Sequence, residues 1–503
     1  MQRALNFFKA RFPSGEINPV VVKEMRQSVR NWSVTGMLIL FLTVLFIAMM
    51  IFLLGQSITG NATQGLGREI LQMFLPILTF FSTVFIPIYV GVRLAVERQA
   101  HNIDLLYITT LPPARIIRGK LYCGIYLTVL FYAVAMPFLV LTNLLRGVDL
   151  PSIFFVLAMT FLGVVAAIQA AIFVACLPVT KGFKILLTVP AVFFGLFGAG
   201  AIGVAAFGII QSGVGARIGS WGFWSEVLTG FAMCLSVFGL VHLLSIAMIS
   251  PPTANRALPI RIYVAVIWLV TGIIAGAWFW FEGDNDFVEA WMSVFFCITL
   301  VGMLIAVSEG DELSIRVRRT IPENPFKQVI AFVFYSGAAG GLVWIIGMSV
   351  LTVLGGWAMV ELIPEYSTSA ATRMGRFNPD LLPFTITLYL YALAYCLFGL
   401  LIHRRWFSHR PGIFAGMFAL LLPALWVIIP NLVLFFANRF SWEAMGRKQL
   451  GNPMNLASRN AITFLDAHLL CAAIMVFVAG ILVLPWFIRR VKAFKPYRRE
   501  DEA

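Results

Sequence analysis

The chain alternates between long runs of apolar residues and short polar segments. The runs are 17 to 26 residues long, and about 20 apolar residues are what an α-helix needs to cross the hydrocarbon core of a bilayer. We place twelve runs, at 33–55, 70–92, 122–143, 153–177, 185–209, 227–248, 262–281, 291–307, 329–354, 381–402, 413–437 and 467–488. The pattern predicts an all-α, polytopic integral membrane protein of about twelve transmembrane helices.

The basic residues indicate the orientation of these helices. When Lys and Arg are counted by alternate segments, 28 of the 37 fall on the side that holds the N-terminal segment 1–32 and the basic tail 489–503. Because basic residues are retained on the cytoplasmic side, we expect both termini in the cytoplasm and the protein in the cytoplasmic (plasma) membrane. The net charge of +14 then places basic groups beside membrane lipids, and no nucleic-acid partner is expected.

The N-terminal segment 1–32 contains a predicted interfacial helix. Asn18 is a favourable N-cap, and Pro19 suits the first turn because an N–H there has no partner in any case. Apolar residues recur at helical spacing, at Val21, Met25, Val29 and Trp32. The other positions are mostly polar, at Lys23, Glu24, Arg26, Gln27 and Arg30. Such a helix is expected to lie in the membrane interface beside the first span, although an ordinary basic flank also fits these residues.

The segment 93–121 is too long for a simple turn between two spans. Apolar residues stand in a loop that otherwise faces water, at Ile103, Leu106 and Leu111. Pro112-Pro113 halts any helix that reaches them, so the pattern predicts a short helix, a break, and a second helix that enters the membrane past Lys120. An exposed helix with an apolar edge is typical of a docking surface, and a loop packed against its own bundle fits equally well.

Two stretches of the chain resemble the permease subunits of ABC-2 type ABC transporters. The run from Asn18 to Gln27 is similar to the start of the elbow helix of that family. The loop is similar to the coupling region of the family at Glu97, Asn102 to Leu106, Thr109 to Pro112, and Gly119-Lys120. His101 stands where the family usually has Gly, and Thr110 where it usually has Pro. The resemblance covers residues 16 to about 248.

The resemblance implies a function and a partner. In that family a separate cytoplasmic ABC ATPase binds the coupling region, and the movement of two ATPase subunits passes through it into the helical bundle. The coupling residues carried over to this chain are Glu97, Asp104, Leu105, Leu106, Leu111, Pro112 and Lys120. The elbow residues carried over are Asn18, Pro19, Lys23, Glu24, Arg26 and Gln27. The chain is then expected to be a permease subunit that exports an unidentified substrate.

The motifs that are missing bear on the source of energy. The sequence has no GxxxxGK[ST] phosphate loop, so we expect no cofactor in this chain and ATP in the partner subunit. The predicted spans lack the carboxylates and basic groups with which ion-coupled carriers bind their ion. Their two histidines, His242 and His468, are expected to be hydrogen bonded rather than proton relays. We find no metal-binding or catalytic motif and expect no enzyme; an ion-coupled carrier and a non-transporting scaffold or subunit are the alternatives.

The second half of the chain, 249–503, is expected to add six more helices to the six of 33–248. Its loop 308–328 occupies the place that the loop 93–121 holds in the first half, which suggests a duplication. Residues 249–261, however, contain three prolines and leave no room for a second elbow helix. A divergent repeat or an added region is therefore favoured. Two assemblies stay open, a homodimer and a single chain whose halves pair.

Overall fold

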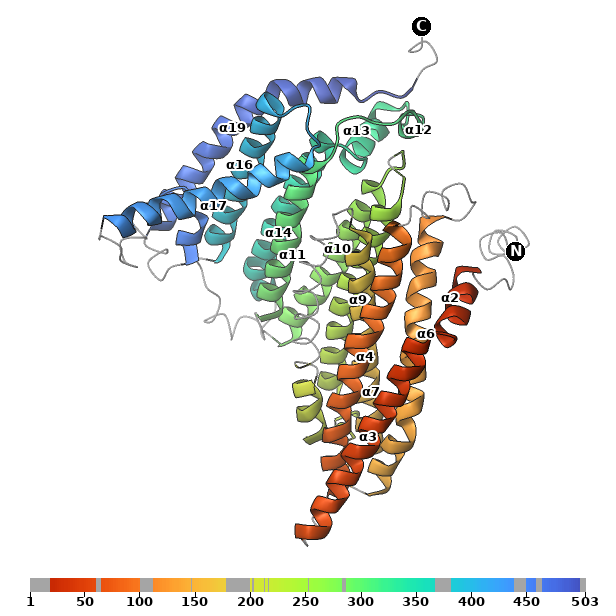
Figure 1. Ribbon diagram of the computed structural model, residues 1–503. Coiled ribbons are helices and arrows are strands. Elements are labelled where there is room, and N and C mark those ends of the chain that lie inside the picture. The colour runs from red at the N-terminus through yellow and green to blue at the C-terminus, as the bar shows by residue number, and fades with distance from the viewer. Residues whose placement is uncertain are drawn as a thin grey trace, which may run out of the picture. The chain divides into compact units, whose positions relative to one another are not determined.

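The computed structural model describes residues 19–59, 65–99, 112–145, 147–177, 200, 203–211, 213–215, 217–251, 253–282, 286–366, 381–437, 449–457 and 464–497. Within these ranges every regular element is a helix (Figure 1). Eleven helices are long and apolar enough to cross a membrane. The prediction of an all-α, multi-span membrane protein is therefore confirmed.

Eleven of the twelve predicted runs each overlap one of these spanning helices. The run 185–209 lies mostly outside the described residues. The prediction for 329–354 is wrong at its start, because two helices occupy it: a short α13 (Pro325–Phe334) and a spanning α14 (Ala338–Tyr366). Gly337 lies between them with φ of +144°, a conformation that favours glycine. The turn has no charged residue and is flanked by apolar residues on both sides, so hydrophobicity alone does not mark it.

The chain divides into two compact units, Met1–Pro251 and Pro252–Ala503. Each is described separately below. The first unit contains α2 (Pro19–Val29), α3 (Trp32–Thr59), α4 (Leu66–Gln99), α6 (Pro113–Leu144), α7 (Leu150–Cys176) and α9 (Trp221–Ile249). The second contains α10 (Ala257–Glu282), α11 (Asp286–Ser308), α12 (Ile315–Arg318), α13, α14, α16 (Leu381–Trp406), α17 (Ile413–Phe436), the 3-10 helix η2 (Pro453–Ala457) and α19 (Leu465–Ala493).

Helix α4 is the centre of the first unit and packs against α7, α6 and α3. Gly91 of α4 and Gly124 of α6 allow these two helices to approach α7 closely. A Cβ at Gly91 would lie 3.3 Å from the carbonyl oxygen of Ala171, and one at Gly124 would lie 2.8 Å from a methyl of Ile168. Aromatic rings fill the space between α3 and α6, with the centroids of Phe41 and Phe131 5.3 Å apart. The helix ends that carry the candidate site are therefore held by a tightly packed core.

Helix α16 has the corresponding central position in the second unit and packs against α17, α19 and α11. At the α16–α17 contact, a Cβ at Gly399 would lie 2.7 Å from the carbonyl oxygen of Ala415 and 2.6 Å from the amide nitrogen of Ala419. Small residues at helix crossings let the two backbones approach closely. In lipid the hydrophobic effect does not drive helices together, so their association depends on close van der Waals packing of this kind.

Two of the spanning helices have little protein around them. Only 11% of the most apolar window of α3 and 6% of that of α17 is buried. Soluble proteins rarely expose apolar surfaces of this size to water. The bilayer itself is the solvent for these helices, which agrees with their composition.

We predict that Gly399→Ala destabilises the second unit. The added methyl would overlap the α17 backbone at Ala415 and Ala419, and overpacking of this kind costs about 1–3 kcal/mol. Gly480→Ala in α19 is the matched control, because nothing lies within 4 Å of its Cβ position and alanine favours the helix by about 0.5–1 kcal/mol. Thermal unfolding in detergent should show a lower midpoint for the first variant alone. Equal midpoints would contradict the close α16–α17 contact.

Candidate functional site

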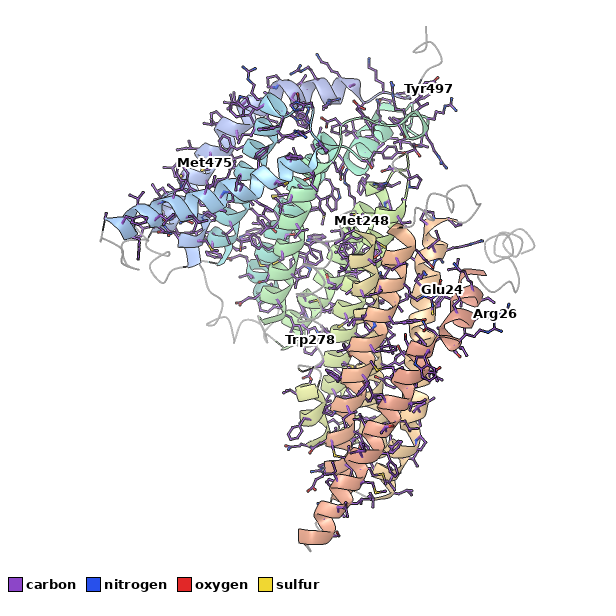
Figure 2. The ribbon with its side chains drawn as sticks, in the orientation of Figure 1. Glu24, Arg26, Met248, Trp278, Met475 and Tyr497 are labelled. Carbon is purple, nitrogen blue, oxygen red and sulfur yellow. The ribbon has the colours of Figure 1, made fainter. Side chains whose placement is uncertain are left out.

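Helix α2 presents an acidic residue to the bundle. Its buried positions are Val21, Glu24 and Ser28, spaced by three and four residues, and they face α6. Figure 2 shows Glu24 directed toward the bundle and Arg26 directed away from it. This corrects two expectations. Glu24 does not belong to an exposed polar face, and the main neighbour of the helix is α6 rather than the first span. Val29 and Trp32 of the predicted apolar face are exposed, as lipid-facing side chains would be.

Lys120 joins three elements. Its side chain is only 2% exposed, and its Nζ lies 2.8 Å from Oε1 of Glu24 and 2.7 Å from Oε2 of Glu97. Glu97 is at the end of α4 and Lys120 two turns into α6, so the pair closes the base of the segment 100–111. Lys23 Nζ lies 3.7 Å from the other oxygen of Glu97. Two ammonium groups and two carboxylates thus balance their charges.

A second contact fixes α2 to α4. Arg93 donates from Nη2 to the side-chain oxygen of Gln27 at 2.5 Å and from Nη1 to the hydroxyl of Tyr89 at 2.7 Å. Asn31, just after α2, also donates to that hydroxyl, at 3.4 Å. We call the side chains of Lys23, Glu24, Gln27, Arg93, Glu97 and Lys120 the elbow network. It binds α2 to the last turns of α4 and the first turns of α6.

Burial decides the strength of this network. An ammonium group removed from water loses several kcal/mol of solvation, and it stays charged only where carboxylates replace that solvation. Glu24 and Lys120 meet this condition, since both are almost fully buried and 2.8 Å apart. The Lys23–Glu97 contact is longer and more exposed, so it contributes about 1 kcal/mol or less. The buried pair is the part that the fold depends on.

The other predicted site residues divide into two groups. Pro19 and Pro112 are described: Pro19 is the first residue of α2, and Pro112 is the N-cap of α6, with φ of −69° and ψ of 146° and an exposed side chain. The remaining five lie outside the described residues: Asn18, Asp104, Leu105, Leu106 and Leu111. Sequence reasoning missed Arg93 and Tyr89. The signal was present, because Tyr89, Arg93 and Glu97 are spaced by four residues and therefore share one face of α4.

The second unit contains a buried pair of its own. Arg261 of α10 donates from Nη2 to both carboxylate oxygens of Glu309, at 2.8 and 2.7 Å, and is 4% exposed. Its Nη1 donates to the backbone oxygens of Val333 and Tyr335, at 2.9 and 2.6 Å. The amide of Gly337 donates to Glu309 at 2.6 Å. The pair therefore clamps the turn between α13 and α14 against α10 and α11.

Asp311 provides a further anchor in the same loop. It pairs with Arg404 at the end of α16 and with Arg490 near the end of α19, the latter at 3.3 Å. The guanidinium of Arg404 also lies 3.9 Å from the ring centroid of Trp486, a favourable cation–π distance. The loop that sequence reasoning paired with 93–121 is thus tied to α10, α16 and α19.

The two histidines inside the predicted runs, His242 and His468, both have uncharged hydrogen-bond partners. Nδ1 of His242 lies 3.1 Å from Oε1 of Gln169. Gln169 is nearly fully buried, and its Nε2 donates to the hydroxyl of Ser245. Nδ1 of His468 lies 2.9 Å from the hydroxyl of Tyr391. The expectation that both histidines are hydrogen bonded is confirmed.

We predict that Lys120→Met destabilises the first unit by about 3–5 kcal/mol, because it leaves the buried Glu24 carboxylate without its cation. Lys23→Gln removes an ammonium from the same network at its exposed edge and should cost about 1 kcal/mol or less. Adding Glu24→Met to Lys120→Met should recover part of the loss, since an apolar pair has no charge to solvate. Thermal unfolding in detergent measures all three. A Lys120→Met protein as stable as the Lys23→Gln protein would contradict the assignment.

In the part of the chain that is described, the site is a network of ion pairs and hydrogen bonds between α2, α4 and α6. Among those residues, no group of three or more His, Cys, Asp or Glu side chains is placed to hold a metal ion. Comparison of the chain with protein-family models, with curated proteins and with solved structures found no match in any of the three.

Proposed function

We propose that the chain is the membrane-spanning permease subunit of an ATP-driven ABC-2 type transporter that works with a separate cytoplasmic ATPase. The observation that supports this most is the contact of Lys120 with both Glu24 and Glu97. One buried lysine links the elbow helix to both ends of the segment that resembles the coupling region of that family. The two resembling stretches are far apart in sequence, and they meet at this residue.

The network suits the transmission of movement. A force on the segment 100–111 would reach α4 at one end and α6 at the other, and these helices are joined by the contact of Glu97 with Lys120 at 2.7 Å. Because α4 packs against α3, α6 and α7, a displacement of its end moves packed side chains rather than a free loop. The elbow helix follows, since Glu24 and Gln27 hold it to α6 and α4.

The proposal assigns roles to the remaining residues. Asp104, Leu105, Leu106, Leu111 and the exposed Pro112 form the docking surface for the ATPase. Glu97 and Lys120 transmit its movement to α4 and α6. Export is the direction that the resemblance favours. Spans without charged residues in their apolar runs suit a lipid-like, hydrophobic or polymeric cargo better than an ion.

The first test is affinity purification of the tagged chain from its native membrane in mild detergent, followed by mass spectrometry. We expect an ABC-type ATPase in near-stoichiometric amount, and the ratio of the chains distinguishes a homodimer from a single chain whose halves pair. If an intact, monodisperse chain purifies without an ATPase, the proposed transporter lacks the subunit that supplies its energy. The ion-coupled carrier and the non-transporting scaffold would then be favoured.

We predict that Leu105→Asp/Leu106→Asp abolishes ATPase association while membrane insertion stays normal, because a charged pair cannot enter an apolar docking contact. Leu450→Asp is the control: it adds a charge at an apolar side chain that is 46% exposed, in a segment that precedes η2 and is predicted to lie on the opposite side of the membrane. Co-purification measures the association. Normal association of the double variant would rule out the docking assignment.

A further inference from the structure

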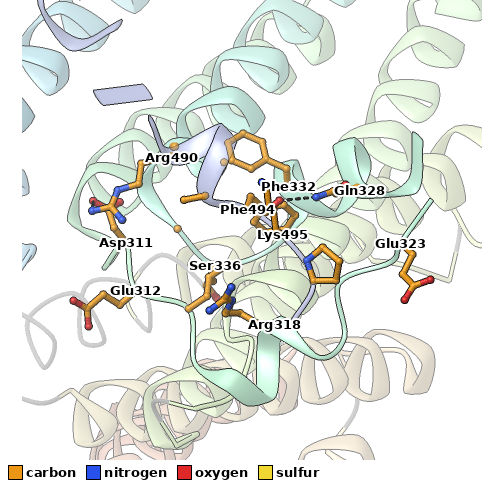
Figure 3. A pocket seen from close by; sticks show the side chains of 16 residues that line it. Asp311, Glu312, Arg318, Glu323, Gln328, Phe332, Ser336, Arg490, Phe494 and Lys495 are labelled. Atoms are coloured by element: carbon orange, nitrogen blue, oxygen red, sulfur yellow. Dashed lines mark hydrogen bonds and ion pairs between the residues drawn. The ribbon is translucent and has the colours of Figure 1, made fainter. Parts of the chain in front are cut away.

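The second unit holds a pocket of 1240 Å³ at one end of its helices. Its walls come from the segment after α11, from α12 and α13, from the start of α14, and from the end of α19 and the residues that follow it. Figure 3 shows Arg490 beside Asp311 on one side of the pocket and Gln328 and Glu323 on the other. Its volume is somewhat above the range of about 300–1,000 Å³ that is usual for small-molecule sites. A large amphiphile fits it better than a small ion.

The walls of this pocket are held in place by contacts with one another. Phe494 is buried between the rings of Phe332 and Tyr335, with centroid distances of 5.3 and 6.1 Å. The side chain of Gln328 donates to the backbone oxygen of Phe494 at 2.5 Å, a bond drawn in Figure 3. The amide of Tyr497 donates to the backbone oxygen of Arg318 at 3.3 Å. A pre-formed site of this kind loses little free energy to ordering when it binds.

The charge around the pocket favours an anion. Arg318 reaches it from α12, and Arg490 and Lys495 reach it from the end of α19. The stretches 308–328 and 489–497 together contain eight Lys and Arg against four Asp and Glu. Glu309 is paired with Arg261 and Asp311 with Arg404, and neither of these arginines belongs to the two stretches. The lining itself holds three acids, Asp311, Glu312 and Glu323, and Asp311 also contacts Arg490. The excess of basic residues therefore lies in the region around the pocket, which is net positive, while the charges of the lining are balanced.

The side chains around the pocket are typical of a surface that contacts membrane lipid. The face of α13 turned away from it carries Phe326 and Val329, which are 74% and 65% exposed, and the chain then passes into the spanning helix α14. On α19, the exposed Ile488 and Val491 flank Arg490. Apolar side chains that border basic groups at the end of a span mark the level of the lipid headgroups. The pocket therefore lies where the phosphate of a phospholipid is found.

We propose that this pocket binds the headgroup of an anionic membrane phospholipid. Its phosphate interacts with Arg318, Arg490 and Lys495, and its acyl chains leave along the apolar surface beside Ile488 and Val491. A lipid bound there would hold α12, α13 and the end of α19 together at the membrane surface. This site belongs to the second unit alone and does not depend on the proposed transport function.

The test compares two double variants that lose the same charge. Arg318→Gln/Lys495→Gln removes cations that line the pocket, whereas Arg316→Gln/Lys492→Gln removes exposed cations from the same two elements outside it. The delipidated full chain is titrated with phosphatidylglycerol in detergent, and one-to-one complexes are counted by native mass spectrometry. We expect the pocket variant to bind about tenfold more weakly and the control less than about threefold. Equal weakening would show diffuse attraction and overturn the site.

Two further measurements separate other outcomes. Glycerol phosphate, which has the phosphate but no acyl chains, should compete only at concentrations at least about a hundredfold higher than the lipid; competition at equal concentrations would overturn a lipid as the ligand. If the double variant does not fold, Lys495→Gln alone serves, because this side chain is exposed at the tail. We expect Lys495→Arg to retain binding, and unchanged binding by Lys495→Gln would remove this residue from the site.

Discussion

A buried cation needs a buried carboxylate beside it, and this requirement organises both units. Lys120 is the strongest case, because at 2% exposure its ammonium group contacts the carboxylates of Glu24 and Glu97 in place of water. Those two carboxylates come from different elements, so satisfying one ammonium group brings three elements to one point. The packing of α4 against its neighbours then makes the arrangement rigid. In the second unit Arg261 imposes the same requirement and meets it with Glu309 and two backbone carbonyls.

The two buried pairs use different chemistry for a similar purpose. The ammonium of Lys120 is a point charge with donors that can turn, and it is shared between two carboxylates on separate helices. The guanidinium of Arg261 has a planar fork, so it binds one carboxylate with two hydrogen bonds and still reaches the backbone oxygens of Val333 and Tyr335. The first pair connects elements across the base of a loop. The second fixes the shape of a single turn, the one that separates α13 from α14.

The sequence predicts the spanning helices well because lipid imposes a simple rule on them: about 20 apolar residues are needed to cross. The same rule hides the turn at Gly337, since α13 and α14 are both apolar and no charged residue separates them. The candidate site is harder to predict. Glu24 was placed on the polar face of its helix because hydropathy cannot distinguish a carboxylate in water from one paired with Lys120, whose position 96 residues away is fixed only by tertiary packing. The family motifs assigned Glu97 and Lys120 to the same coupling region, and in the structure their side chains are in contact.

The separation of Glu24 and Lys120 along the chain also bears on how the protein is made. At a synthesis rate of about 5–20 residues per second, the 96 residues between them take about 5–20 s to translate. During that time α2 has left the ribosome with its inward-facing carboxylate unpaired, and α3 and α4 insert first. Helix α2 can take its final place only when the start of α6 arrives. The elbow helix, first in sequence, is therefore fixed in place only after α3 and α4 have been made.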